Sequence, residues 1–380
     1  MAYLEVLIGG RAVESDAHQA LVGAGAILKR LRHHAVVAPF RLHTPMLEKI
    51  LHDSRVQKAT HGLSLATLRS GEIASTYAVG IRGAHDGAAV NSRTVFEAAS
   101  LTKPVVSFIA LQLAEEGLLD LDRPLHAICG SFVADDERAK AITALHVLTH
   151  SSGLPNIAGA GTPLKTYFAP GERFNYGSSA FGWLQQAIER LTDSPLEEVA
   201  CTRVFKAFGM TDSSLNWQDR FESNHAQGRE INGQAVSKRR PVKAAASWSL
   251  LTTATDYAHF VQAVLRGTGL SSTMHTRWFT PMIAAREGVD DVLNSDAAEE
   301  KDVAWGLGWG LEPSQGCFFH WGHNPGFRAF VMGSLETKDA VVWFANSASG
   351  LRLARHVLPE VLPGRHRSLD WLQIGKTFDE

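Results

Sequence analysis

The sequence has few cysteines and none of the spacings in which cysteine builds a structural site. Its 380 residues contain three, Cys129, Cys201 and Cys317, far apart and without a CxxC pair. An odd, scattered set does not form a disulfide framework and is typical of a reducing compartment. The 17 histidines form no HExxH motif and no paired Cys/His spacing. We therefore expect no metal site.

The chain also lacks a long apolar run. No stretch of about 18 uninterrupted apolar residues occurs, so we expect no membrane span. In residues 1–44, the apolar segment ALVGAGAIL is followed by basic residues instead of preceded by them. This order is the reverse of a secretory signal. We expect a cytoplasmic protein in which residues 1–44 form an N-terminal extension of unknown role.

A strong net charge is missing as well. The formal net charge is −2, so no overall field attracts the protein to nucleic acid or to an anionic membrane. One short basic cluster, SKRRPVK at 237–243, lies in a polar stretch, and we interpret it as a solvated loop and not as a polyanion site. The expected partner is a small molecule. The sequence contains no signal for the oligomeric state.

The composition, 45% apolar and 20% charged, is that of a globular protein, and β-rich runs lie near both ends of its chain. The segment 61–83 alternates around the turn Ser70-Gly71 and predicts a β-hairpin. Three short runs near the carboxyl end, CFFHWG, FRAFVMGSL and AVVWFANS, predict strands separated by turns.

Helical patterns and loops fill the middle of the chain, and the polar segment 286–302 predicts a loop. The economical fold is an α+β sandwich whose antiparallel sheet comes from both chain ends, is flanked by helices and receives a large, mainly helical insertion. We place one catalytic domain at 45–380. Its sheet part spans about 45–95 and 310–380, and its helical part about 96–309.

The segment TKPVVSFIALQLAEEG is apolar nearly all round, as in a buried helix. Pro104 is tolerated in a first turn, which predicts a helix start near Ser100. Ser100 and Lys103 then share one face at the helix amino terminus. An ammonium beside a hydroxyl favours the alkoxide, and burial lowers a lysine pKa so that the amine can move protons. The alternative is an N-cap serine followed by a surface lysine.

Five segments resemble, in order, the serine β-lactamase and penicillin-binding-protein-like superfamily, which includes class C β-lactamase-related hydrolases and β-lactamase-like carboxylesterases. They are TVFEAASLTKPVVSFIALQLAEEGLLDLDRPL, ALHVLTHSSGLP, FAPGERFNYGSSAFGWL, GLGWGL and FFHWGHNPGF. The first contains the S-x-x-K nucleophile motif. The resemblance covers roughly residues 45–360 and implies the β-lactamase/transpeptidase-like fold with the sandwich described above.

The family's second motif, Tyr-x-Asn, is Tyr176-Gly177-Ser178 here. The resemblance implies that Tyr176 accepts the proton of Ser100 and that Lys103 holds the phenol as a phenolate or near it. Ser178 can contact a substrate carbonyl but loses the reach of an amide, which weakens the case for efficient β-lactam hydrolysis.

His320-Trp321-Gly322 occupies the position of the third motif, usually Lys-Thr-Gly, and His323 follows. A histidine holds a substrate carboxylate less firmly than a lysine. Trp321 stands at the threonine position of the motif, so a hydroxyl is lost and a bulky ring is added. Both changes favour esters or neutral acyl groups. By analogy, Gly322 lets the strand approach the substrate. The backbone N–H groups of Ser100 and His323 would form the oxyanion hole.

The resulting hypothesis is a serine hydrolase with an acyl-Ser100 intermediate that needs neither metal nor organic cofactor. We expect a carboxylesterase acting on small or medium acyl esters. The alternatives are a β-lactamase or D-amino-acid-specific peptidase or amidase, and a non-catalytic acyl-binding or penicillin-binding sensor. No GxSxG elbow occurs, so we interpret His150 and Ser151 as structural loop residues. Trp305 and Trp309 are interpreted as buried packing residues.

Overall fold

The computed structural model describes residues 44–83, 87–159, 161–288, 292–294 and 296–375. The N-terminal extension expected at 1–44 lies almost wholly outside these residues. In the described part of the chain, no helix is long and apolar enough to cross a membrane.

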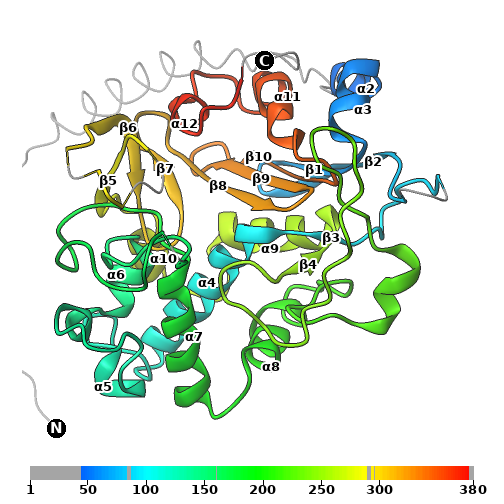
Figure 1. Ribbon diagram of the computed structural model, residues 1–380. Coiled ribbons are helices and arrows are strands. Elements are labelled where there is room, and N and C mark those ends of the chain that lie inside the picture. Colours follow the sequence, from blue (N-terminus) through cyan, green and yellow to red (C-terminus); the bar gives the residue numbers. More distant parts are fainter. Residues whose placement is uncertain (1–43, 84–86, 160, 289–291, 295, 376–380) are drawn as a thin grey trace, which may run out of the picture. The chain divides into compact units, whose positions relative to one another are not determined.

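The main element is an eight-stranded antiparallel sheet with strand order β2-β1-β10-β9-β8-β7-β6-β5 (Figure 1). Its central strands are apolar on both faces and buried, as expected for a sheet covered on two sides. The strands are β1 (Gly62–Arg69), β2 (Glu72–Gly80), β5 (Ile283–Arg286), β6 (Glu299–Trp305), β7 (Gly310–Glu312), β8 (Cys317–Asn324), β9 (Phe327–Ser334) and β10 (Ala340–Ala345). Two short strands, β3 (Phe96–Glu97) and β4 (Leu251–Thr252), pair separately.

The sheet joins the two ends of the described chain, as predicted. Strand β1 pairs with β2 on one side and with β10 on the other, in the register Leu65↔Trp343. The predicted hairpin and all three carboxyl-terminal runs are strands. This confirms the α+β class and the antiparallel sheet.

The predicted boundary at residue 309 between the helical and sheet parts is wrong. Strands β5 and β6 also belong to the sheet, and part of the polar segment predicted as a loop forms β6. In β6 the first four residues are at least partly exposed, and burial begins at Val303. A strand near the sheet edge with so many polar residues gives little apolar signal.

Helices cover both faces of the sheet (Figure 1). On one side α9 packs on β1, β2 and β10, near α4, and on the other side α11 packs on β10 and α2. The helices are α2 (Thr44–Leu51), α3 (Ser54–Thr60), α4 (Thr102–Glu115), α5 (His126–Cys129), α6 (Ala144–Leu148), α7 (Ser179–Thr192), α8 (Leu196–Ala200), α9 (Ala254–Arg266), α10 (Ser272–Trp278), α11 (Ala354–Val361) and α12 (Arg367–Trp371). This arrangement is the predicted sandwich.

The amino-terminal end of α4 faces the sheet through a short 3₁₀ turn, Ala99–Leu101. Ala99 has φ 51°, a left-handed conformation that costs a residue with a Cβ about 1 kcal/mol or more. The hydroxyl of Thr102 donates to the Ala99 carbonyl at 2.7 Å, and the Leu250 N–H donates to that hydroxyl at 3.0 Å. These bonds hold the turn that precedes the helix.

Candidate active site

Ser100 and Lys103 lie together at the start of α4, as their spacing predicts. The Lys103 Nζ donates to the Ser100 Oγ at 2.9 Å and to the Ser247 carbonyl at 3.1 Å. The Lys103 side chain is 0% exposed, whereas Ser100 lies on the wall of a cavity. Lys103 is therefore a buried residue, and the alternative interpretation as a surface lysine is wrong.

Burial lowers the pKa of Lys103 well below its usual value, because a charged amine loses its hydration there. Among the described residues, no carboxylate is hydrogen-bonded to its Nζ, so no opposite charge offsets the burial. The amine is thus driven toward its neutral form beside the Ser100 hydroxyl.

Tyr176 lies at the same place, in the loop that precedes α7. Its side chain is 3% exposed, and the Lys103 Nζ lies 4.8 Å from the centre of its ring. The Trp321 ring packs against it at 4.7 Å between centres. Serine, lysine and tyrosine from two separate segments therefore surround one point at the cavity wall.

His150 holds the Tyr176 loop, a contact that the sequence did not reveal. The Gly177 N–H donates to its Nδ1 at 3.0 Å, and its ring centre lies 4.3 Å from that of Tyr176. Burial, helped by the charge of Lys103 and by His320, holds the pKa of His150 well below its usual value. The ring is therefore a neutral acceptor at Nδ1. The segment LTHSSGLP that resembles the family was the available signal for this role.

Strand β8 sends alternate side chains to its two faces, which separates the residues of the third motif. Trp321 and His323 line the cavity, whereas His320 and Gly322 are not among the lining residues. His320 is 0% exposed, and its Nδ1 bonds to the Trp321 carbonyl at 2.8 Å. Burial, together with Lys103, lowers the pKa of His320 to about 3. The imidazole is neutral and buried, and it does not line the cavity in which it was predicted to contact substrate.

Gly322 allows a close approach, but to the protein backbone. A Cβ at this position would lie 2.4 Å from the Ala98 carbonyl oxygen and 3.2 Å from the Ala99 Cβ. The glycine therefore lets β8 press against the turn that carries Ser100, where we expected an approach to substrate. The neighbouring His323 N–H remains the predicted second donor of the oxyanion hole.

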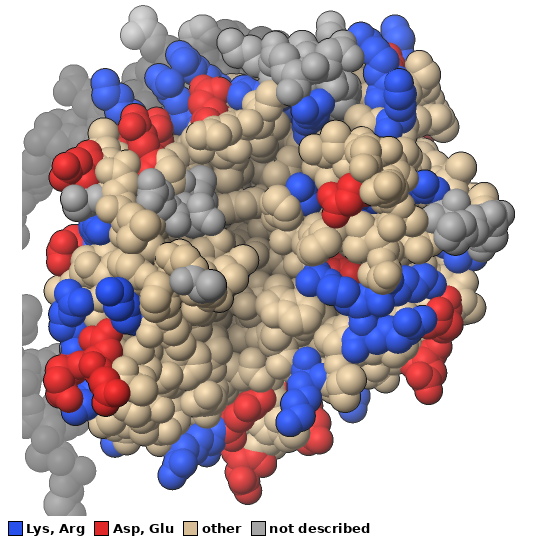
Figure 2. Space-filling model, in the orientation of Figure 1, with Lys and Arg blue, Asp and Glu red and all other residues tan. Residues whose placement is uncertain are grey.

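The cavity measures about 920 Å³ and opens on the face shown in Figure 2, where a hollow is visible near the centre. Ser100 is one of the lining residues, and the surface of the cavity is largely apolar. It is lined by Ser100, Asn156, Ile157, Ala158, Tyr176, Ser178, Ser179, Arg239, Ser247, Trp248, Trp321, His323, Asn324, Pro325, Leu351 and Leu372.

An amide lies beside Ser178 although the second motif itself lacks one. The Ser178 hydroxyl donates to the Asn156 Oδ1 at 2.6 Å, and the Ser178 N–H bonds the same oxygen at 3.2 Å. Both side chains line the cavity. Asn156 therefore supplies an amide from a different segment, a residue that the motif comparison missed.

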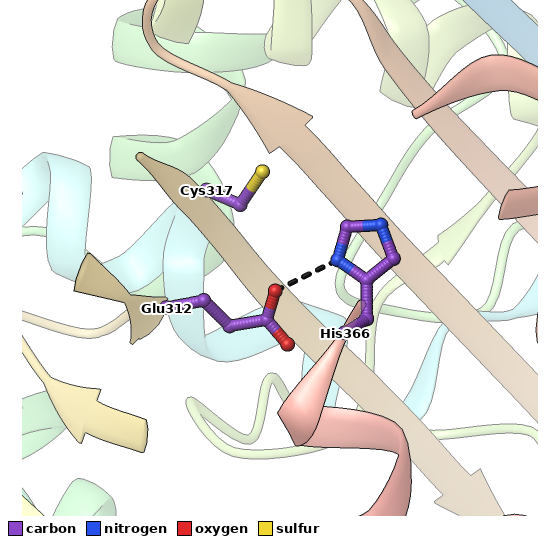
Figure 3. Close-up of side chains that lie close together, drawn as sticks. All are labelled: Glu312, Cys317 and His366. Atoms are coloured by element: carbon purple, nitrogen blue, oxygen red, sulfur yellow. Dashed lines mark hydrogen bonds and ion pairs between the residues drawn. The ribbon is translucent and has the colours of Figure 1, made fainter. Parts of the chain in front are cut away.

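One group of potential metal ligands occurs among the described residues, at Glu312, Cys317 and His366 (Figure 3). The His366 Nδ1 lies 2.7 Å from Glu312 Oε2, its Nε2 lies 2.7 Å from the Leu362 carbonyl, and the Ser368 N–H bonds Glu312 Oε1. Protein groups already satisfy these atoms. Burial and nearby acids raise the pKa of Cys317 to about 12, which keeps the thiol protonated. The geometry fits a buried ion pair better than a metal site.

The fold defines the class of protein: an α+β protein of the β-lactamase/transpeptidase type. The model of the Beta-lactamase family matches residues 46–362, so the chain belongs to that family. Members of the family are serine hydrolases.

Relatives with different activities match the chain. Esterase EstB of Burkholderia gladioli is 29% identical over 199 residues, 44% of this chain and 50% of the esterase. Penicillin-binding protein 4 of Amycolatopsis lactamdurans is 25% identical over 297 residues, 72% of this chain and 75% of that protein. The solved octameric penicillin-binding protein homologue from Pyrococcus abyssi superposes with a TM-score of 0.68 at 19% identity, covering 83% of this chain and 76% of the homologue. The chain thus spans half the length of the esterase, and the structural likeness shows the fold.

Proposed function

We propose that the protein is a carboxylesterase that cleaves small or medium acyl esters through an acyl-Ser100 intermediate. The observation that carries the proposal is the 2.9 Å contact between the Lys103 Nζ and the Ser100 Oγ, which joins a fully buried lysine to a serine that lines the cavity. An amine driven toward neutrality can accept the hydroxyl proton as the oxygen attacks a carbonyl carbon.

Lys103 and Tyr176 act as one proton-accepting unit. A neutral amine with a phenol, and an ammonium with a phenolate, differ only in the position of a proton, so either group can hold the proton that the unit accepts. The unit takes the proton of Ser100 during attack and returns it to the leaving alcohol. It then accepts a proton from the water that attacks the acyl-serine, and it returns this proton to the Ser100 Oγ as the acid leaves.

The oxyanion is stabilised by the backbone N–H groups of Ser100 and His323. The left-handed Ala99 and the glycine at 322 bring the turn and strand β8 together. Fixed dipoles of this kind stabilise the charge that develops on the carbonyl oxygen, each contributing about 3 kcal/mol.

The walls of the cavity favour an ester with an apolar part. Ile157, Trp248, Trp321, Leu351 and Leu372 line it, and their apolar surface stabilises acyl or aryl groups by removing them from water. His320 is buried and neutral, so it offers no charge to a carboxylate at the third motif. The relation to EstB supports the same choice.

A β-lactamase or D-amino-acid-specific peptidase or amidase is the second candidate. Asn156 places an amide beside Ser178, as acylamide recognition requires, and a penicillin-binding protein is among the relatives. A non-catalytic acyl-binding or penicillin-binding sensor is the third.

Parallel assays separate the candidates. On purified protein we expect turnover of p-nitrophenyl butyrate, with nitrocefin and D-alanyl p-nitroanilide cleaved at least about a hundred-fold more slowly in kcat/KM. The reverse order would establish the second candidate. Stoichiometric labelling by a β-lactam without turnover of any substrate would establish the sensor.

A further inference from the structure

Arg239 carries the permanent charge on the cavity wall. Among the described lining residues it is the single arginine, and lysine, aspartate and glutamate are absent. Its side chain is 34% exposed. A molecule in the cavity therefore meets one cation and no carboxylate. The sequence placed the basic cluster 237–243 in a solvated loop, but the structure brings this member of it to the cavity.

The guanidinium is fixed in place by buried partners. Its Nε and Nη2 donate to Glu97 Oε2 at 3.1 and 2.5 Å, and the Glu97 side chain is 4% exposed. The Asn324 Nδ2 donates to the same oxygen at 2.7 Å. The guanidinium also stacks on the Trp248 ring at 4.8 Å. No described residue accepts a hydrogen bond from Nη1, so the group keeps donors for a ligand.

The surrounding loop adds positive charge. Lys238 and Arg240 share one exposed partner, Glu222, at 3.4 and 2.8 Å, which leaves the loop with an excess of cations. Figure 2 shows Lys and Arg side chains gathered beside the hollow. Because the fields of such groups add, this side of the cavity mouth attracts anions.

We propose that Arg239 forms a carboxylate-binding subsite, so that the preferred substrates are esters that also carry a free carboxylate at a distance from the scissile bond. The inference rests on the proposed function, because the ester is cleaved at Ser100. A guanidinium held by a buried acid presents a preorganised fork that matches a carboxylate. This subsite lies apart from His320, the position that the sequence comparison assigned to anion recognition.

Two matched substrate pairs test the subsite without assuming which side of the ester faces Arg239. Mono-p-nitrophenyl adipate is compared with p-nitrophenyl hexanoate, and p-(butyryloxy)benzoate with p-tolyl butyrate. For at least one pair we expect the anionic ester to have the higher kcat/KM, chiefly through KM, and the advantage to fall with added salt. Arg239→Gln should reduce the anionic-to-neutral ratio about ten-fold or more, because a hydrogen bond to a charged group is lost.

The neighbouring Arg240 gives the matched control, since it pairs with Glu222 and is not a lining residue. Arg240→Gln removes part of the long-range field of the loop but no contact in the cavity, so it should lower the ratio by no more than about two-fold. Arg239→Lys keeps a charge opposite Glu97 and should give an intermediate ratio, which separates recognition from any loss of folding in Arg239→Gln.

The outcomes distinguish this inference from the proposed function. Turnover of all esters with no preference for either anionic ester, or a preference unchanged in Arg239→Gln, overturns the subsite and leaves the esterase intact. If no ester is cleaved, the proposed esterase activity is wrong. Ligand binding at Arg239 then tests the subsite on its own. Calorimetry with p-butyramidobenzoate and its neutral toluidine analogue should then show tighter binding of the acid, lost in Arg239→Gln. Equal binding overturns the inference.

Discussion

Lys103 is the residue whose environment decides the chemistry. It is fully buried, and its ammonium form has no described carboxylate beside it. A buried cation without a partner is costly, and the protein reduces that cost by favouring the neutral amine. In the proposed mechanism, the same loss of hydration that would destabilise a structural lysine supplies a base to Ser100.

This environment predicts the pH dependence of turnover. The reactive form lacks one proton on the Lys103–Tyr176 unit, so kcat/KM should rise with pH and reach its plateau well below pH 10.5, the usual pKa of lysine. Lys103→Arg cannot release its proton and should lose about a thousand-fold or more in kcat with no rising limb. A rising limb that survives in Lys103→Arg would show that another group is the base.

His150 is predicted to position Tyr176. His150→Phe keeps a ring but removes the acceptor for the Gly177 N–H, so we expect kcat to fall about ten-fold or more with little change in KM. His150→Asn restores an acceptor and should recover part of kcat. His146→Asn is the control, because His146 caps the nearby helix α6 and is not part of the Tyr176 contact.

A purely structural His150 would give another result. Its variants would then lower the melting temperature while the folded fraction kept a normal kcat. Equal kcat for His150→Phe and His150→Asn would also contradict the positioning role.

At the scale of elements, a buried ion pair joins the carboxyl-terminal segment to the sheet. Glu312 ends β7 and His366 precedes α12, and the pair is buried (Figure 3). Burial lowers the pKa of His366, but the hydrogen bond and charge of Glu312 outweigh it and leave the pKa raised above 6.5. The imidazolium is thus stabilised in the folded state.

The raised pKa of His366 determines how the stability of the protein changes with pH. The contribution of His366 to stability is complete below its unfolded pKa, about 6.5, and is lost as pH rises through the higher folded pKa. His366→Gln should lower the free energy of unfolding by about 3 kcal/mol at pH 6 and by less at pH 9. Urea unfolding measures this difference, with the exposed His52→Gln as control. A difference that grows with pH would contradict the ion pair.

The elements themselves show what the sequence could and could not predict. The hairpin and the strands β8, β9 and β10 were predictable, because their apolar runs and turns are strong local signals. Strand β6 was not, because its polar first half resembles a loop. The separation of α2 from α3 rests on Asp53, whose side chain accepts from the Arg55 N–H and caps α3.

The residues of the candidate site also fall into those that the sequence could predict and those that it could not. Ser100 and Lys103 were predictable from spacing on one helix, and Tyr176 from the family resemblance. His150, Asn156 and Arg239 were not, because their roles depend on contacts between distant segments. His320 and Trp321 were both predicted to contact substrate, but alternation along β8 places Trp321 at the cavity and buries His320.

At the scale of the whole molecule, the site exists because the two ends of the described chain close one sheet. Strand β10 lies between β1 and β9, and β9 supports β8 against the turn that carries Ser100. The helical insertion delivers Tyr176 to this point, and the later loop delivers Arg239. Each group comes from a separate part of the chain, so the assembly of the site depends on the complete fold.

The measurement that tests the central claim most directly is mass spectrometry of the protein during turnover of p-nitrophenyl butyrate after rapid acid quenching. The account predicts a butyryl adduct on the peptide that contains Ser100, absent in Ser100→Ala, which should also lose about a thousand-fold or more of the ester turnover. An adduct on another residue, or ester turnover retained by a folded Ser100→Ala protein, would contradict it.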